Sequence, residues 1–110
     1  MKALAFASIT AAALPCALLA AAPAAAQQDL AARSLAATCA NCHGTDGHAR
    51  GAVMKPLAGM PAERLLTLMA GYQRGSEPST VMQQIARGYS DAQLRLIAAY
   101  FAAVPPAPPR

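Results

Sequence analysis

Three residues suited to metal or sulfur chemistry lie close together in the run Cys39-Ala40-Asn41-Cys42-His43. The C-x-x-C-H spacing is typical of covalent attachment of a c-type haem. Two cysteines at this spacing lie on neighbouring faces of one helical turn, so both sulfurs reach the two vinyl groups along one porphyrin edge. The imidazole of His43 then lies under the ring and binds iron as the proximal axial ligand. The motif predicts one covalent haem c held by Cys39, Cys42 and His43.

Other chemistries of two nearby cysteines fit the sequence less well. A thioredoxin-like redox pair needs a βαβ setting, and the chain has no strand pattern. A zinc site needs two further ligands, of which His48 supplies at most one. A plain disulfide is the first interpretation of two cysteines in an exported protein, but it gives no role to the adjacent His43. Haem attachment accounts for all three residues of the motif.

A six-coordinate haem iron needs a second axial ligand, and methionine is the usual choice because its thioether favours ferrous iron. Met69 shares the apolar face of a predicted helix with Leu65, so it is better interpreted as core. Met54 and Met60 come before this helix, yet the chain must pass round the haem edge to reach the far face. Met82 follows the helix. Geometry alone therefore favours Met82, with Met60 next.

The remaining polar and aromatic candidates have simpler interpretations. His48 lies in a glycine-rich loop, where a histidine is more often exposed than an alternative iron ligand. The three tyrosines are most often packing groups, although one of them is a candidate partner for a haem propionate. Arg74 and Arg87 are candidates for the same pairing, with solvated surface as the simpler interpretation.

Four helical stretches, separated by loops rich in glycine or proline, must position these residues. The first spans residues 29–41, and the loop 43–59 follows it. Its apolar residues at helical spacing are Leu30, Ala31, Leu35 and Cys39. No run shows the alternation of a half-buried strand, so the predicted class is all-α.

Cap signals delimit the second and third helices. Pro61 suits the first position of the second helix, and Gly75 stops it. The apolar positions between them are Ala62, Leu65, Met69 and Tyr72. Thr80 and Gln83 form a candidate capping box for a short third helix that ends at Gly88.

The last helix begins at a second capping-box signature, Ser90 with Gln93. Its predicted inward residues are Leu94, Ile97, Ala98 and Phe101. Pro105 and Pro106 end it, and the proline-rich tail 105–110 is expected to be extended or disordered. The sequence thus predicts about four helices around one covalent haem.

The first quarter of the 110-residue chain is crowded with alanine and has the pattern of a secretory signal. Lys2 gives a positive start, an apolar stretch follows, and the triplet Ala24-Ala25-Ala26 suits a signal peptidase. A retained anchor needs a longer and bulkier apolar run. We expect residues 1–26 to be removed and the protein to be periplasmic.

Lipid attachment at Cys16 is the less favoured alternative, because Pro15 precedes it and a better cleavage site lies downstream. Cleavage after position 26 leaves one domain at 27–104, which contains the haem motif, and the tail at 105–110. A chain of this size is near the lower limit for a stable apolar core, which a haem would enlarge.

The charge of the chain excludes some partners. Without Lys2, eight basic residues face five acidic ones, and two haem propionates lower the balance to about +1. Such a balance indicates neither nucleic acid nor a membrane surface, and we expect no stable membrane insertion.

These residues resemble a class I c-type cytochrome across essentially the whole predicted mature chain. The resemblance is carried in order by residues 39–44, by Leu57-Ala58-Gly59, by a following methionine and by Tyr100. A more specific resemblance, over residues 72–101, is to the haem subunit of flavocytochrome c sulfide dehydrogenase. It lies in Gly75, Thr80-Val81-Met82, the run 85–90 and the run 99–101. In that family the methionine placed like Met82 is the distal axial ligand, so the resemblance implies this role for Met82.

The family resemblance also implies how the ends of the domain meet. Its terminal helices cross beside the haem, with contacts expected among Ala31, Leu35, Ile97 and Tyr100. Many relatives have a proline two residues before the Leu-Ala-Gly run, and its carbonyl accepts a hydrogen bond from the proximal histidine. Here that position is Lys55, and Pro56 follows, so either carbonyl is a candidate for orienting His43. Some relatives carry two haems, whereas this chain has one C-x-x-C-H motif.

These observations predict an electron-transfer protein, not an enzyme, whose iron changes oxidation state while it stays six-coordinate. The resemblance implies a flavoprotein sulfide dehydrogenase subunit as redox partner, with a free periplasmic shuttle as the variant. A ligand-binding or peroxidatic haem protein with an open distal site is the rival. A small helical interaction module with a disulfide is the non-haem interpretation.

Overall fold

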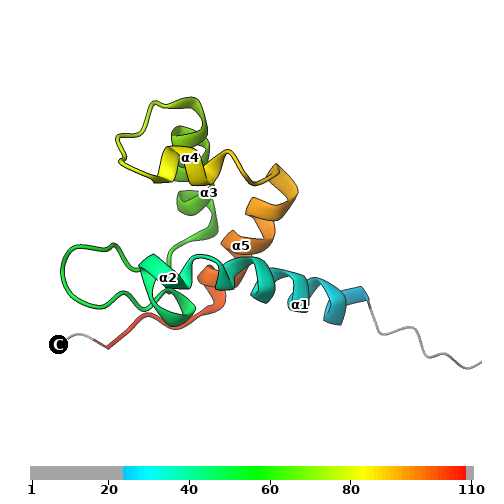
Figure 1. The fold of residues 1–110 in the computed structure, drawn as a ribbon. Helices are drawn as coiled ribbons and strands as arrows, with labels where there is room; N and C mark the ends of the chain where they lie inside the picture. The colour runs from blue at the N-terminus through cyan, green and yellow to red at the C-terminus, as the bar shows by residue number, and fades with distance from the viewer. Residues whose placement is uncertain (1–23, 109–110) are drawn as a thin grey trace, which may run out of the picture.

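The computed structural model describes residues 24–108, which form an all-helical structure (Figure 1). The elements in chain order are α1 (Ala24–Ala37), α2 (Ala40–His43), the 3-10 turn η1 (Thr45–Gly47), α3 (Ala62–Arg74), α4 (Met82–Ala86) and α5 (Asp91–Ala103). The described residues include no strand, so the all-α prediction is confirmed. Within the same range no helix is long and apolar enough to cross a membrane. The predicted signal lies outside the described residues except for 24–26, which belong to the first turn of α1.

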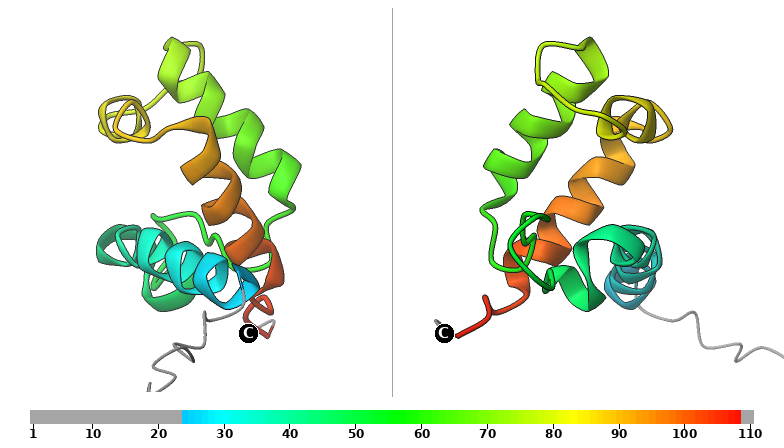
Figure 2. Two further views of the ribbon diagram at one scale, coloured as in Figure 1. Left: turned by 90° about the vertical axis from the view of Figure 1, so that its right-hand side faces the viewer. Right: turned by 60° about the vertical axis from the view of Figure 1, so that its left-hand side comes forward.

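Helix α1 packs across α5, but through a face other than the predicted one (Figure 2). Ala32 and Ala36 are its buried residues, whereas Ala31 is exposed and Leu30 is 67% exposed. Leu35 is partly buried against the core. The expected inward positions of Leu30 and Ala31 are therefore wrong. An alanine-rich helix shows little contrast between its faces, and small side chains at the crossing let the two backbones approach closely.

Helix α3 ends at Gly75 as the sequence predicts, but it begins at Ala62, one residue later than predicted. Pro61 is its N-cap, and Gly75 closes it in the left-handed conformation with φ of 77°. Glycine adopts this conformation without the steric penalty of a Cβ, which is why it stops helices so often. Leu65 and Met69 are buried in the core, as the apolar spacing predicts. Tyr72 is half-buried at the border of the core.

The short helix α4 begins at Met82, but the predicted capping box is not formed. Val81 is the N-cap and makes no side-chain capping bond. The N–H of Gln83 instead donates to Oγ of Ser79 at 3.0 Å. Ser79 thus has the role expected of Thr80, because the loop ahead of the helix turns the earlier hydroxyl toward the free N–H groups.

Helix α5 confirms its predicted start and its predicted inward face. The N–H of Gln93 donates to Oγ of Ser90 at 3.3 Å, and the N–H of Ser90 donates to Oε1 of Gln93 at 2.9 Å. This reciprocal cap satisfies two N–H groups that a helix start leaves unpaired. Its four buried residues are Leu94, Ile97, Ala98 and Phe101. The helix ends at Ala103 and packs against both α1 and α3, so it is the centre of the core.

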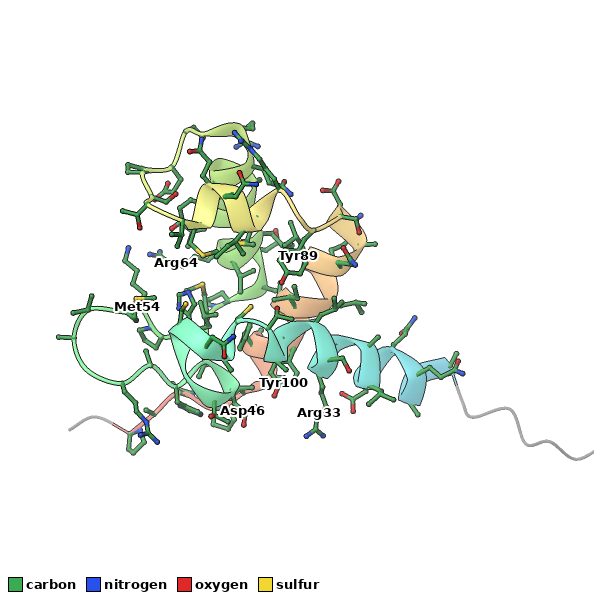
Figure 3. The ribbon with its side chains drawn as sticks, viewed as in Figure 1. Arg33, Asp46, Met54, Arg64, Tyr89 and Tyr100 are labelled. Carbon is green, nitrogen blue, oxygen red and sulfur yellow. The ribbon has the colours of Figure 1, made fainter. Side chains whose placement is uncertain are left out.

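The loop between η1 and α3 is docked on the last turns of α5. The hydroxyl of Tyr100 donates to Oδ1 of Asp46 at 2.6 Å, and Figure 3 shows the two side chains meeting. The hydrogen bond to this carboxylate raises the pKa of Tyr100, because it stabilises the protonated phenol. The N–H of Gly59 donates to the carbonyl of Phe101 at 2.9 Å. Consecutive residues of α5 therefore hold η1 and the far end of the loop.

Gly47 lies where the two ends of the loop meet and where the loop packs on α5. Its carbonyl accepts hydrogen bonds from the N–H groups of Leu57 at 2.9 Å and Ala58 at 3.2 Å. Its φ is 77°, and an added Cβ would lie 2.7 Å from N of Ala58 and 2.9 Å from Cδ1 of Phe101. Real Cβ atoms do not approach other atoms so closely, so both the conformation and the space require glycine.

Gly47→Ala is expected to destabilise the protein more than Gly51→Ala. Both glycines have φ of 77°, but a Cβ on Gly51 would meet no atom within 4 Å. Each substitution incurs the left-handed penalty of about 1–2 kcal/mol, and only Gly47→Ala adds overpacking of about 1–3 kcal/mol. Urea unfolding of the two variants measures the difference. Equal losses of stability would contradict the close docking of the loop.

Candidate functional site

The predicted haem-attachment motif lies on a break between two helices. Thr38 and Cys39 form a turn that divides the single helix expected over residues 29–41. The N–H of Cys39 donates to the carbonyl of Ala36 at 3.0 Å. This bond spans three residues, as in a 3-10 turn, and not the four of a regular α-helix. Helix α2 then restarts, with Cys39 as its N-cap and His43 in its last turn. The C-x-x-C-H run therefore forms one short helical turn of its own.

Both cysteine side chains are free thiols, with Cys39 half-buried and Cys42 exposed. Burial raises the pKa of the Cys39 thiol, and Cys42 adds to the rise while a hydrogen bond with Thr38 opposes it.

The ring of His43 is oriented by a backbone carbonyl. Its Nδ1 lies 2.7 Å from the carbonyl oxygen of Lys55, which requires Nδ1 to carry the proton and donate. The second ring nitrogen, Nε2, is then the one that is available to bind a metal. Of the two carbonyls left open by the sequence, Lys55 and not Pro56 accepts this bond. A main-chain oxygen is independent of side-chain identity, so lysine replaces the proline of the family pattern without loss of the bond.

An apolar cavity of about 330 Å³ lies beside the motif, within the range of small-ligand and cofactor sites. It brings together the two cysteines, His43 and four methionines. These methionines are Met54, Met60, Met69 and Met82. Core residues from α3 and α5, among them Leu65 and Ile97, form its floor. The donor set of two thiols, an imidazole and thioethers, in an apolar enclosure, fits a c-type haem.

The four methionines differ in position and burial. Met69 is 8% exposed on α3 and belongs to the core, as the sequence predicts. Met82 is the first residue of α4 and is partly buried. Met54 belongs to the loop after η1 (Figure 3), and Met60 directly precedes the N-cap of α3.

A second hollow in the described part of the chain differs from this cavity in its lining. A shallow hollow of about 650 Å³ between α1 and α5 contains no cysteine, histidine or methionine. Across the described part of the chain no three His, Cys, Asp or Glu residues gather as a metal site, so the zinc alternative has no support. His48 is half-buried and lies outside the lining of the apolar cavity.

One contact at the cavity has no signal in the sequence. Thr38 and Tyr89 both line the cavity, and their hydroxyl oxygens lie 2.6 Å apart. The two residues are 51 positions apart, and no sequence pattern predicts that they are in contact. The sequence favours a packing role for Tyr89 and indicates no role for Thr38.

No protein-family model matches the chain. Among curated proteins it is 40% identical over 67 residues to the cytochrome subunit of sulfide dehydrogenase of Chlorobaculum tepidum, covering 61% of this chain and 60% of the relative. It is 38% identical over 69 residues to the thiosulfate dehydrogenase electron acceptor of Stutzerimonas stutzeri, covering 60% of this chain and 32% of that protein. The chain therefore spans less than two thirds of the length of these two relatives.

A third relative is matched over most of its length. Cytochrome c-554(548) of Halomonas halodenitrificans is 34% identical over 67 residues, which are 58% of this chain and 81% of that protein. Similarity over most of a small cytochrome, together with the all-helical fold, determines the family. The chain belongs to the class I c-type cytochromes.

Proposed function

We propose that the protein carries single electrons through one haem c, attached at Cys39 and Cys42 and ligated on its proximal side by His43. The observation that carries this proposal is the fixed imidazole. Its Nδ1 is engaged by Lys55, so Nε2 is available at a cavity that both free thiols also line. One haem accounts for every residue of the single motif.

Met82 is proposed as the distal axial ligand. It lines the same cavity as His43 but comes from α4, after the chain has passed along α3. Met69 is held in the core by its neighbours, which favours a packing role. The resemblance of residues 72–101 to sulfide dehydrogenase haem subunits supports the choice of Met82 over Met60.

The bound haem would supply the one-electron couple of its iron. The residues of the chain keep the ligand set unchanged: Lys55 holds the imidazole, and the apolar lining excludes water. One electron enters from a donor and the same electron leaves to an acceptor, so no bond is made or broken. Fixed ligands keep the structural change small between the two oxidation states.

We further propose that the electrons come from a periplasmic dehydrogenase of inorganic sulfur compounds. One relative is a subunit of sulfide dehydrogenase and another is the electron acceptor of thiosulfate dehydrogenase. A flavoprotein sulfide dehydrogenase subunit is the favoured partner, and a free shuttle is the variant. Co-elution with the flavoprotein in gel filtration is expected for a subunit, whereas separate elution would identify a free carrier.

Intact mass spectrometry of the periplasmic protein tests attachment and export together. We expect the mass of residues 27–110 plus one haem, because the motif holds one ring and the predicted signal is removed. The Cys39→Ala/Cys42→Ala variant should lose the covalent haem and accumulate poorly, while Cys16→Ala serves as the control and should match the unmodified protein. A normal holoprotein yield from the double variant would contradict the attachment. A lipid on Cys16 would contradict the proposed localisation.

Met82→Ala is expected to keep the covalent haem but to abolish the weak red absorption band of ferric iron bound to thioether sulfur. The variant should also have a lower reduction potential and bind carbon monoxide when reduced. Met54→Ala, Met60→Ala and Met69→Ala are matched controls that should keep the band, with Met69→Ala costing about 2–5 kcal/mol as a core truncation.

Two results would contradict the assignment of Met82. Loss of the band in Met60→Ala and its survival in Met82→Ala would transfer the role to Met60. Absence of the band from the unmodified protein would favour the rival function, a ligand-binding or peroxidatic haem protein with an open distal site.

A further inference from the structure

Helix α4, which begins with Met82, is attached mainly to α3. It packs on that helix, and its last carbonyl, at Ala86, accepts a hydrogen bond from Nε2 of Gln73 at 3.0 Å. The same amide group donates to the carbonyl of Tyr89 at 3.1 Å. Gln73 thus ties the end of α4 and the turn after it to α3. None of these contacts reaches the other side of the cavity, where the C-x-x-C-H motif lies.

One hydrogen bond crosses from this turn to the motif. Oγ1 of Thr38 lies 2.6 Å from the hydroxyl oxygen of Tyr89, and Thr38 directly precedes Cys39. Thr38 also donates to the carbonyl of Leu35 at 2.7 Å, so its single hydroxyl proton is used there. The Tyr89 hydroxyl is therefore the donor of the bond to Thr38. Within the described chain, no other hydrogen bond joins residues 38–47 to residues 76–90.

We propose that Tyr89 is a positioning residue whose hydrogen bond to Thr38 holds the Met82 side of the cavity closed against the His43 side. Figure 3 shows Tyr89 between α4 and α1, and both partners of the bond line the cavity. The inference rests on the proposed ligation of haem by His43 and Met82. The bond shifts the equilibrium between closed and open cavities toward closed, and so keeps an added ligand from replacing Met82.

The ring and the hydroxyl of Tyr89 have separable roles. The ring packs against the core, as an ordinary structural tyrosine does. Tyr89→Phe retains the ring and removes only the donor to Thr38. Tyr72→Phe is a matched control, because Tyr72 is also half-buried, packs on the same core and lines the same cavity. Among the described residues its hydroxyl makes no hydrogen bond.

Imidazole binding to the ferric holoprotein measures how often the distal position opens. Loss of one net hydrogen bond should lower the apparent Kd for imidazole roughly two- to tenfold in Tyr89→Phe and in Thr38→Val. The double variant should bind no more tightly than either single one, because both remove the same bond. Thr38→Ser keeps a hydroxyl and should restore the original Kd, as should Tyr72→Phe. Amide hydrogen exchange at Gln84 and Ile85 in α4 should be faster in Tyr89→Phe than in the unmodified protein. In Tyr72→Phe the exchange rates should be unchanged.

Equal imidazole affinity in Tyr89→Phe and Tyr72→Phe would overturn the inference, and so would additive effects in the double variant. Both results leave the proposed electron-transfer function intact. If the unmodified ferric protein shows no thioether band, the proposed Met82 ligation fails, and this inference is overturned with it.

Discussion

The hydrogen bond between the His43 ring and the Lys55 carbonyl is the constraint on which the other features of the site depend. It engages Nδ1 of His43 with a backbone atom and leaves Nε2 available for the proposed haem iron. The carbonyl is in place because its loop is folded back on Gly47 and docked on the end of α5. The packing of the helices and the closed loop therefore together determine the orientation of the His43 imidazole. Because the acceptor is a main-chain oxygen, a lysine at position 55 can provide this bond.

The two sides of the cavity are built differently. The side of His43 is anchored by helix α2, the Lys55 carbonyl and the loop docked on α5, all within a continuous network of hydrogen bonds. The side of Met82 is a five-residue helix joined to α3 through Gln73 and to the motif through Tyr89. Local stability follows the density of such contacts, so we expect the Met82 side of the cavity to open first. An electron carrier benefits from keeping it closed, because loss of a ligand changes the reduction potential.

The haem proposed for the cavity also completes the core. Leu65, Met69 and Ile97 are buried on one side by neighbouring helices, and on the other they line the cavity. Few other large side chains are fully buried in the described chain, where Phe101 is the largest. A small domain gains little stability from so few residues, so a large apolar ring packed among them adds what the chain lacks. Covalent attachment keeps that part of the core in place.

The sequence by itself determined the features that rest on contacts within a few residues. The all-α class, the left-handed end of α3 at Gly75, the capping box at Ser90 and the apolar face of α5 are all local. The C-x-x-C-H motif belongs to the same group, since one helical turn positions it. Tertiary structure alone decided which face of the alanine-rich α1 is buried and which hydroxyl caps α4. It also decided which carbonyl orients His43 and that Thr38 meets Tyr89, because these contacts join segments that only the folded chain brings together.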